Sequence, residues 1–494
     1  MNDPKHSVTK QSTYVTLIRM AGLCFAVAVD LLMITRFGAD ATVDVYFLAL
    51  TLPNILYILL ISNCVPTILP LLQTADQQHT IAHDVSNIIS WLLLAIGGTV
   101  LIGILITPLG LQIYNQLTDQ ALQTFGTQVA TILFTALLPL ALIEPIRAWL
   151  LLNDYFVLAS FGYLLHHVVS LTTFLFGYQQ WGVTVLAWGF LAGMILQLLF
   201  FCVVSVALWG RWFRPKLLLS QPIAKALFTN LLPAISGDLI RQSNVIVERI
   251  IAATLPVSTL SLVGYARRML ASLNGLFAPA ITTVLLPRMT KAAQSGAYQS
   301  VGDLLRYGIS LILLVTGNVT LGIASVGMVV IVWLFEWNSA EIQQLFTVFG
   351  LALPTIGLGQ LGTTTLFALG KTQFVFASRA ISMLAYLIIS IIAVMQFGVL
   401  GLGIAIAGEG IIQLATALLF AQRQHVQLPA QFMQHTVISG GLLCLIALIL
   451  LRLDPSWSKL TWQIAAFATS SLLFTAHILH SQQFVSRSRL LFRS

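Results

Sequence analysis

The segment FGADATVDVYFLALTLPNI, residues Phe37–Ile55, is apolar over most of its length but contains polar residues that a lipid-facing helix avoids. Asp44 begins the apolar run, and the pair Pro53-Asn54 interrupts it. About 20 apolar residues suffice to cross the hydrocarbon core of a bilayer. A membrane helix that carries a charge and a proline is typical of a segment that lines a cavity in a polytopic protein.

The whole chain has the composition of such a protein. Of its 494 residues, 58% are hydrophobic and 8% are charged, whereas soluble domains contain about 25% charged residues. Apolar runs recur along the chain, so the sequence predicts an all-α polytopic membrane protein with about 14 transmembrane helices. The predicted spans lie near 14–36, 44–72, 85–108, 128–151, 156–178, 183–209, 226–253, 259–287, 303–335, 342–368, 372–397, 399–422, 431–451 and 461–482.

Basic residues predict the orientation of these spans. An even number of spans places both termini on one side of the membrane. With the N-terminus in the cytoplasm, most flanking Lys and Arg residues fall inside, and only Arg36, Arg452 and Lys459 fall outside. This bias follows the positive-inside rule, so we expect both termini to be cytoplasmic. The rule also accounts for the net charge of +8, and nucleic acid is not indicated as a partner.

The longest cytoplasmic loop predicts the division into domains. We expect an N-terminal six-helix lobe at 1–210, a linker at 211–225, a second six-helix lobe at 226–424, and two further helices with a basic tail at 425–494. The loop GRWFRPKLLLSQPIAKA (Gly210–Ala226) combines Trp and Phe with Arg and Lys. It fits an interfacial segment and an ordinary basic linker equally well.

The sequence contains no motif that indicates an enzyme, a nucleotide site or a metal site. The four cysteines lie singly in apolar runs, without a CxxC pair, and the phosphate-binding pattern GxxxxGK[ST] is absent. We therefore expect no catalysis, no cofactor and no metal. Any transport must then draw its energy from an ion gradient, the membrane potential or the gradient of the substrate itself.

Charged residues inside the predicted spans mark candidate functional positions, because a charge at the centre of a membrane helix costs about 2.5–3.5 kcal/mol. They are concentrated in the first eight spans, at Arg19, Asp30, Asp44, Glu144, Arg147, Asp238, Arg241, Glu248, Arg249, Arg267 and Arg268. Glu144 and Arg147 are three residues apart and form a predicted local pair. Pro145, between them, predicts a kink.

The seventh span, SGDLIRQSNVIVERI (Ser236–Ile250), carries three of these charges on one helical stripe. Asp238, Arg241 and Glu248 recur at helical spacing. Asp238 and Arg241 either neutralise each other at i, i+3 or line a hydrated cavity together with Glu248. So much polarity on one face exceeds what a single ion pair needs, which favours the cavity.

Arg267 and Arg268 are adjacent in the eighth span, so their side chains point about 100° apart and cannot both meet one partner. We expect one to pair with Asp238 or Glu248 and the other to bind an anion. Arginine suits phosphate because its planar guanidinium group donates two parallel hydrogen bonds. A substrate with a pyrophosphate group would match such a pocket. Snorkelling of the arginines to the membrane interface is the alternative.

Several of these segments together resemble one known family. The opening segment is similar to the FGA…TDAFFVAF-x-LPN signature of the MurJ (MviN-like) lipid II flippases, which belong to the MOP exporter superfamily. Further segments resemble the same family in the same order: AWLLLNDYFVLASF (Ala148–Phe161), VLAWGFLAGMILQLLF (Val185–Phe200), LLPAISGDLI (Leu231–Ile240), YARRMLASLNGLFAPAITTVLLPRMTK (Tyr265–Lys291) and LFALGKTQFVFASR (Leu366–Arg379).

The resemblance implies two pseudo-symmetric six-helix lobes plus two C-terminal helices around a central cavity, in the bacterial cytoplasmic membrane. It implies that the chain flips a polyprenyl-pyrophosphate-linked saccharide, either lipid II or a related lipid-linked glycan, by alternating access. We expect the chain to act as a monomer among membrane lipids. The alternatives are a MATE-like or polysaccharide exporter of the same superfamily, or a non-transporting membrane scaffold for cell-envelope synthesis.

The resemblance also suggests roles for individual residues. The expected substrate contacts are Arg241, Arg267, Arg268, Asp44 and Asn54. Pro53 is the expected hinge of the second span. The expected cavity charges, which would tune the pocket or couple it to protons, to a monovalent cation or to the membrane potential, are Asp30, Glu144, Arg147, Asp238 and Glu248.

The chain also departs from the family pattern. Val29 and Tyr57 stand where family members carry cavity arginines, and Arg267 replaces an acidic residue. The set of phosphate-binding charges is therefore smaller in the first two spans and larger in the eighth.

Overall fold

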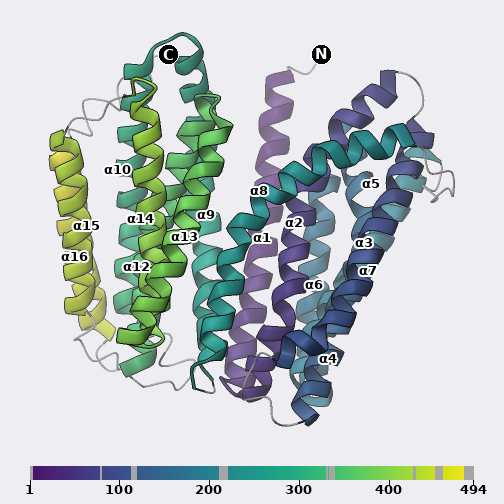
Figure 1. Ribbon diagram of the computed structural model, residues 1–494, viewed down its shortest axis with the longest axis horizontal. Coiled ribbons are helices and arrows are strands. Elements are labelled where there is room, and N and C mark those ends of the chain that lie inside the picture. The colour runs from purple at the N-terminus through teal and green to yellow at the C-terminus, as the bar shows by residue number, and fades with distance from the viewer. Residues whose placement is uncertain are drawn as a thin grey trace. The chain divides into compact units, whose positions relative to one another are not determined.

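The structure is a computed structural model that describes residues 4–77, 81–112, 120–210, 221–256, 258–329, 332, 340–426, 430–450 and 460–482. These residues form long helices joined by short connections, and no strand occurs among them (Figure 1). The prediction of an all-α membrane protein is confirmed. The chain divides into two compact units, Met1–Ser261 and Leu262–Ser494.

The first unit contains the helices up to α8. Its elements are α1 (Pro4–Phe37), α2 (Ala41–Gln77), α3 (Ile81–Gln112), α4 (Gln120–Thr135), α5 (Leu140–Leu152), α6 (Phe156–Trp181), the short 3-10 turn η1 (Gly182–Thr184), α7 (Val185–Trp209) and α8 (Gln221–Ala253). Of the predicted linker, residues 211–220 lie outside the described part of the chain. The predicted lobe boundaries stay a prediction.

The second unit contains the remaining helices. They are α9 (Thr259–Gln294), whose first residues still belong to the first unit, α10 (Tyr298–Gly322), α12 (Ala340–Ala368), α13 (Thr372–Phe397), α14 (Leu400–Gln422), α15 (Ala430–Leu450) and α16 (Leu460–Gln482). Helix α10 continues into a π-helical turn, η2 (Ile323–Gly327).

Eleven segments of the described chain are long and apolar enough to cross a membrane. One of them, Phe156–Trp209, contains both α6 and α7, which η1 separates. Helices α8 and α16 coincide with predicted spans but are not among the eleven. Their assignment as membrane spans stays a prediction, and α8 carries Lys225, Asp238, Arg241, Glu248 and Arg249.

The outer faces of the helices are strongly apolar. Helix α3 exposes Leu101 and Leu105, and α13 exposes Ile388 and Met395, each by more than half. Soluble proteins rarely present such continuous apolar surface to water. These faces fit contact with lipid chains, which is what the predicted membrane spans require.

The fourth predicted span is divided into two helices. Helix α4 ends at Thr135 and α5 begins at Leu140. The connection tightens, because Leu137 N–H bonds to Phe134 O and Leu138 N–H bonds to Thr135 O, three residues back. Pro139 follows and has no N–H to continue the helical pattern. Pro145 lies inside α5, so the interruption precedes the position at which a kink was predicted.

Close helix contacts in the second unit depend on glycine. A Cβ atom on Gly410 of α14 would lie 2.4 Å from the backbone carbonyl of Thr355 in α12. A Cβ atom on Gly401 would similarly meet the backbone of Ala393 in α13, at 2.4 Å. Small residues allow membrane helices to approach closely and to gain packing contacts. These glycines therefore fix α14 against both of its neighbours.

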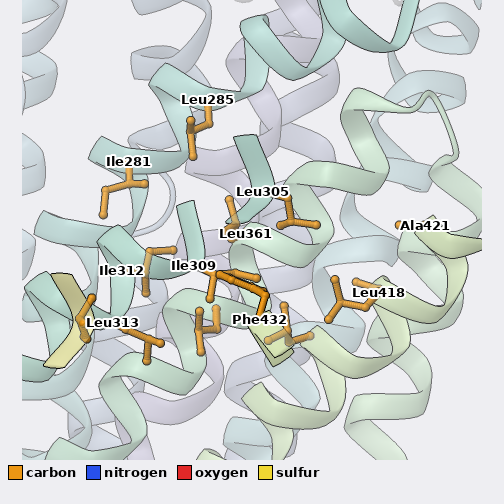
Figure 2. Packing of buried hydrophobic residues seen from close by; sticks show 14 of the residues in the cluster. Ile281, Leu285, Leu305, Ile309, Ile312, Leu313, Leu361, Leu418, Ala421 and Phe432 are labelled. Carbon is orange, nitrogen blue, oxygen red and sulfur yellow. The ribbon is translucent and has the colours of Figure 1, made fainter. Parts of the chain in front are cut away.

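The core of the second unit is built from branched aliphatic side chains of several helices. Helix α10 contributes Leu305, Ile309 and Ile312 to a cluster that also contains Leu361 of α12 and residues of α9, α14, α15 and α16. Figure 2 shows this cluster, in which Phe432 of α15 lies near Leu361 and Ile309. Helix α15 therefore belongs to the core of the unit.

Helix α16 is joined to α10 by a polar contact. Asn318 of α10 donates from Nδ2 to Thr475 Oγ1 at 3.1 Å, and its Oδ1 accepts from Ser471 Oγ at 2.5 Å. Phe474, which lies between Ser471 and Thr475 in the sequence, is fully buried and packs over Gly317 of α10. An amide with both ends bonded in this way fixes the rotation of α16 about its axis.

Candidate functional site

Asp44, the charge in the opening segment, caps a distant helix. It lies in the first turn of α2 and is 1% exposed. Its carboxylate accepts hydrogen bonds from the backbone N–H groups of Ser258, at 2.8 Å, and Ser261, at 2.6 Å. The first N–H groups of a helix have no partner within it. A carboxylate satisfies them and complements the positive end of the helix dipole.

The residue that precedes the capped helix has an unusual backbone conformation. Ser258, just before α9, has a φ of 76°, in the left-handed region that residues other than glycine rarely adopt. In this arrangement both oxygens of Asp44 are engaged in capping α9. The predicted contact between Asp44 and a substrate stays a prediction, and it would require the cap to open.

Arg249 of α8 also contacts the first turn of α9. It is 7% exposed, and its Nη1 donates to the carbonyl oxygen of Leu260 at 3.1 Å. Its guanidinium carbon lies 5.2 Å from the ring centroid of Phe47 in α2. An anion from α2 and a cation from α8 therefore bind the start of α9. Sequence reasoning included Arg249 among the charges in spans but assigned it no role.

Asp238 of α8 is linked to α2. Asn63 Nδ2 donates to Asp238 Oδ2 at 3.1 Å and also to the carbonyl oxygen of Leu59, one turn earlier in its own helix, at 2.8 Å. Asn63 is 9% exposed. The amide thus gives a carboxylate inside the bilayer a hydrogen-bond donor. The prediction did not include Asn63, because a single amide in an apolar run gives no signal of its partner.

Glu144 and Arg147 form the predicted local pair. Arg147 Nη2 lies 2.9 Å from Glu144 Oε2, with Glu144 1% exposed and Arg147 20% exposed. Arg147 Nη2 also donates to the carbonyl oxygen of Ile61 in α2, at 3.4 Å. The prediction of the pair is confirmed, and its contact with α2 is new. Helix α2 therefore contacts the charged groups of both α5 and α8.

The other predicted site residues are placed as follows. Asp30 is half-buried in α1. In α2, Pro53 is buried and Asn54 is exposed, and α2 continues through these two residues as one helix. Arg241 lies in α8, and its side chain is outside the described part. Arg267 and Arg268 are half-buried in α9, in the second unit. Their roles, and their pairing with Asp238 or Glu248, stay predictions.

Tyr57 of α2, at which the resemblance predicts the loss of a cavity arginine, belongs to a group of aromatic side chains. The ring centroid of Tyr57 lies 5.2 Å from Phe190 of α7, which lies 5.0 Å from His166 of α6. His166 and His167 are 5.1 Å apart, and Tyr163 lies 4.4 Å from His167. These edge-to-face contacts join α2, α7 and α6.

The described residues contain no group of three or more His, Cys, Asp or Glu side chains that could hold a metal ion.

The fold is similar to those of two solved transporter structures. The chain superposes on the inward closed conformation of a lipid II flippase MurJ with a TM-score of 0.76, at 18% identity, over 96% of this chain and 99% of that one. It superposes on an inward-facing multidrug resistance MATE family transporter of the MOP superfamily with a TM-score of 0.62, at 12% identity, over 83% of this chain and 94% of that one. At such identities the match concerns the fold alone.

The sequence comparisons are more specific. The profile of the family described as lipid II flippase MurJ matches residues 33–474. The lipid II flippase MurJ of Burkholderia cenocepacia is 24% identical over 371 residues, which are 71% of this chain and 69% of that protein. The chain belongs to the lipid II flippase MurJ family, and the resemblance seen in the sequence is confirmed.

Proposed function

We propose that this chain is a lipid II flippase, which moves lipid II across the bacterial cytoplasmic membrane by alternating access and makes or breaks no covalent bond. The observation that carries the proposal is the match to the lipid II flippase MurJ family over residues 33–474. The membrane-buried contacts of Asp44, Asp238 and Glu144 fit this role, because charges inside membrane helices are typical of a substrate pathway.

In this proposal Arg241, Arg267 and Arg268 bind the pyrophosphate of the substrate, since guanidinium groups pair with phosphate oxygens. The acidic residues Asp30, Asp238 and Glu248, with the pair Glu144–Arg147, tune the pocket and couple it to protons, a monovalent cation or the membrane potential. Such coupling would supply the energy that a chain without a nucleotide site needs. The chain works as a monomer, with both termini in the cytoplasm.

The test uses bacterial cells whose own lipid II flippase can be shut off. The chain should restore growth and the exposure of lipid II on the outer face of the membrane. Expression without either effect contradicts the assignment of lipid II as substrate. That outcome would favour a related lipid-linked glycan as the substrate.

Matched variants test the anion contacts. Arg268→Gln and Arg241→Gln should abolish lipid II exposure at unchanged expression. Arg288→Gln is the control, because Arg288 is exposed and lies two helical turns before the end of α9, the helix that also carries Arg268. Equal activity of Arg268→Gln and Arg288→Gln would show that Arg268 does not contact the substrate.

A further inference from the structure

Helix α4 presents a polar stripe within a segment that is long and apolar enough to span the membrane. Its buried face consists of Gly126, Val129, Ala130, Leu133 and Phe134. On the opposite face Gln120, Thr124 and Gln128 are exposed, at i, i+4 and i+8. They form one row about 12 Å long, since each helical residue rises about 1.5 Å.

This stripe lines a groove of about 600 Å³ within the first unit. The wall opposite α4 is formed by the end of α3, by Thr184 of η1 and by Trp188 of α7, whose side chain is 42% exposed. The residues that line the groove are three glutamines, four threonines, one tryptophan and three apolar residues, and none of them is charged.

The exposed row Gln120, Thr124 and Gln128 offers the groove two amide groups and a hydroxyl oxygen. Thr124 Oγ1 donates to Gln120 O at 2.9 Å, and Thr131 Oγ1 donates to Thr127 O at 2.8 Å. These hydroxyl protons are used within the helix, so the oxygens act as acceptors. Glutamine amides both donate and accept. Placing such amides against lipid chains would cost about 2–7 kcal/mol each without a compensating hydrogen bond.

We propose that this groove binds an uncharged saccharide. A sugar ring offers hydroxyl groups to the row of amides and hydroxyls on α4, and its apolar C–H face can stack on the indole of Trp188. The lining residues that the structure describes are uncharged, and their amide and hydroxyl groups match the hydroxyl groups of a neutral sugar. The lining residues do not include the arginines assigned to the pyrophosphate, and binding there does not require the chain to translocate a lipid.

Direct binding to the purified full-length protein in nanodiscs tests this. The probe is the uncharged disaccharide di-N-acetylchitobiose, followed by saturation-transfer NMR, with a glucuronic-acid-containing disaccharide as the charged comparison. We expect saturable binding of the neutral probe and weaker binding of the charged one. Gln128→Leu and Trp188→Phe should each weaken binding by about tenfold, the effect of losing one good contact.

Two exposed residues at the end of α6, outside the groove, provide matched controls. Gln180→Leu and Trp181→Phe should leave binding unchanged. All four substitutions concern exposed side chains, and thermal unfolding checks that each variant is folded. The proposal is overturned if the wild-type protein binds neither sugar saturably, or if the groove variants and the control variants lose binding equally.

A competition experiment identifies the source of the sugar. A polyprenyl-pyrophosphate-linked disaccharide is added to the nanodiscs, and its displacement of the free probe is measured. Displacement that Gln128→Leu abolishes supports the sugar of a lipid-linked substrate as occupant. Binding of the free disaccharide alone, with the same sensitivity to Gln128→Leu, supports a separate glycan.

Discussion

The carboxylate of Asp44 accepts a hydrogen bond of 2.6 Å from the backbone N–H of Ser261, 217 residues further along the chain. Together with the bond from Ser258, at 2.8 Å, it joins the first turn of α2 to the first turn of α9. A single acidic side chain of α2 therefore binds the last residues of the first compact unit, where α9 begins.

Removal of this cap should destabilise the protein. Asp44→Ala leaves two N–H groups without their acceptor and should lower stability by about 2 kcal/mol or more, because capping contributes about 0.5–2 kcal/mol and the site is buried. Asp44→Asn retains one acceptor oxygen and should lose less. Thermal unfolding in detergent measures both. Equal melting temperatures of Asp44→Ala and the wild-type protein would contradict the capping role.

The pair Glu144–Arg147 should show strong coupling. Each single variant, Glu144→Gln or Arg147→Met, leaves one charge without its partner in the bilayer and should cost about 3–5 kcal/mol. The double variant should cost clearly less than the sum of the two. A double-mutant cycle on unfolding free energies gives the coupling energy. Strict additivity would mean that the ion pair does not contribute to stability.

The contact between Asn63 and Asp238 can be tested by exchange of the two groups. Asn63→Asp places two carboxylates at hydrogen-bonding distance and should reduce stability and expression, because like charges repel strongly in a low-dielectric environment. Adding Asp238→Asn restores one amide and one carboxylate and should recover most of the loss. Failure of the second substitution to rescue the first would show that the two side chains do not interact.

The close approach of α12 and α14 should make Gly410 intolerant of a side chain. In Gly410→Ala the new methyl group would meet the Thr355 carbonyl at 2.4 Å, so we expect a loss of about 1–3 kcal/mol or more. Gly97→Ala in α3 is the matched control, since no atom lies within 4 Å of a Cβ there. It should be neutral or slightly stabilising. Equal melting temperatures of the two variants would contradict the packing of α14.

Local spacing in the sequence predicted local features well. The apolar runs placed the helices, and the i, i+3 spacing predicted the ion pair of Glu144 and Arg147, because both follow from helical periodicity. Pro139 could have predicted the break between α4 and α5, because proline has no backbone N–H to donate to the preceding turn. The prediction considered Pro145 instead, which α5 accommodates in its first two turns.

Contacts across the fold could not be predicted in this way. Asn63 and Asp238 are 175 residues apart, and Asp44 and Ser258 are 214 residues apart. No periodicity in one sequence links such positions. The charge on Asp44 was recognised as unusual, but its partners are backbone N–H groups, which every residue other than proline carries and which therefore leave no mark in the sequence.

Asn318, Ser471 and Thr475 together make the last described helix an integral part of its unit. A truncated chain that lacked α16 would lose the packing of Phe474 over Gly317 and the hydrogen bonds of Asn318 with Ser471 and Thr475. A reporter protein or affinity tag should therefore be fused after Gln482 and never within α16, and a shortened version for crystallisation should keep this helix intact.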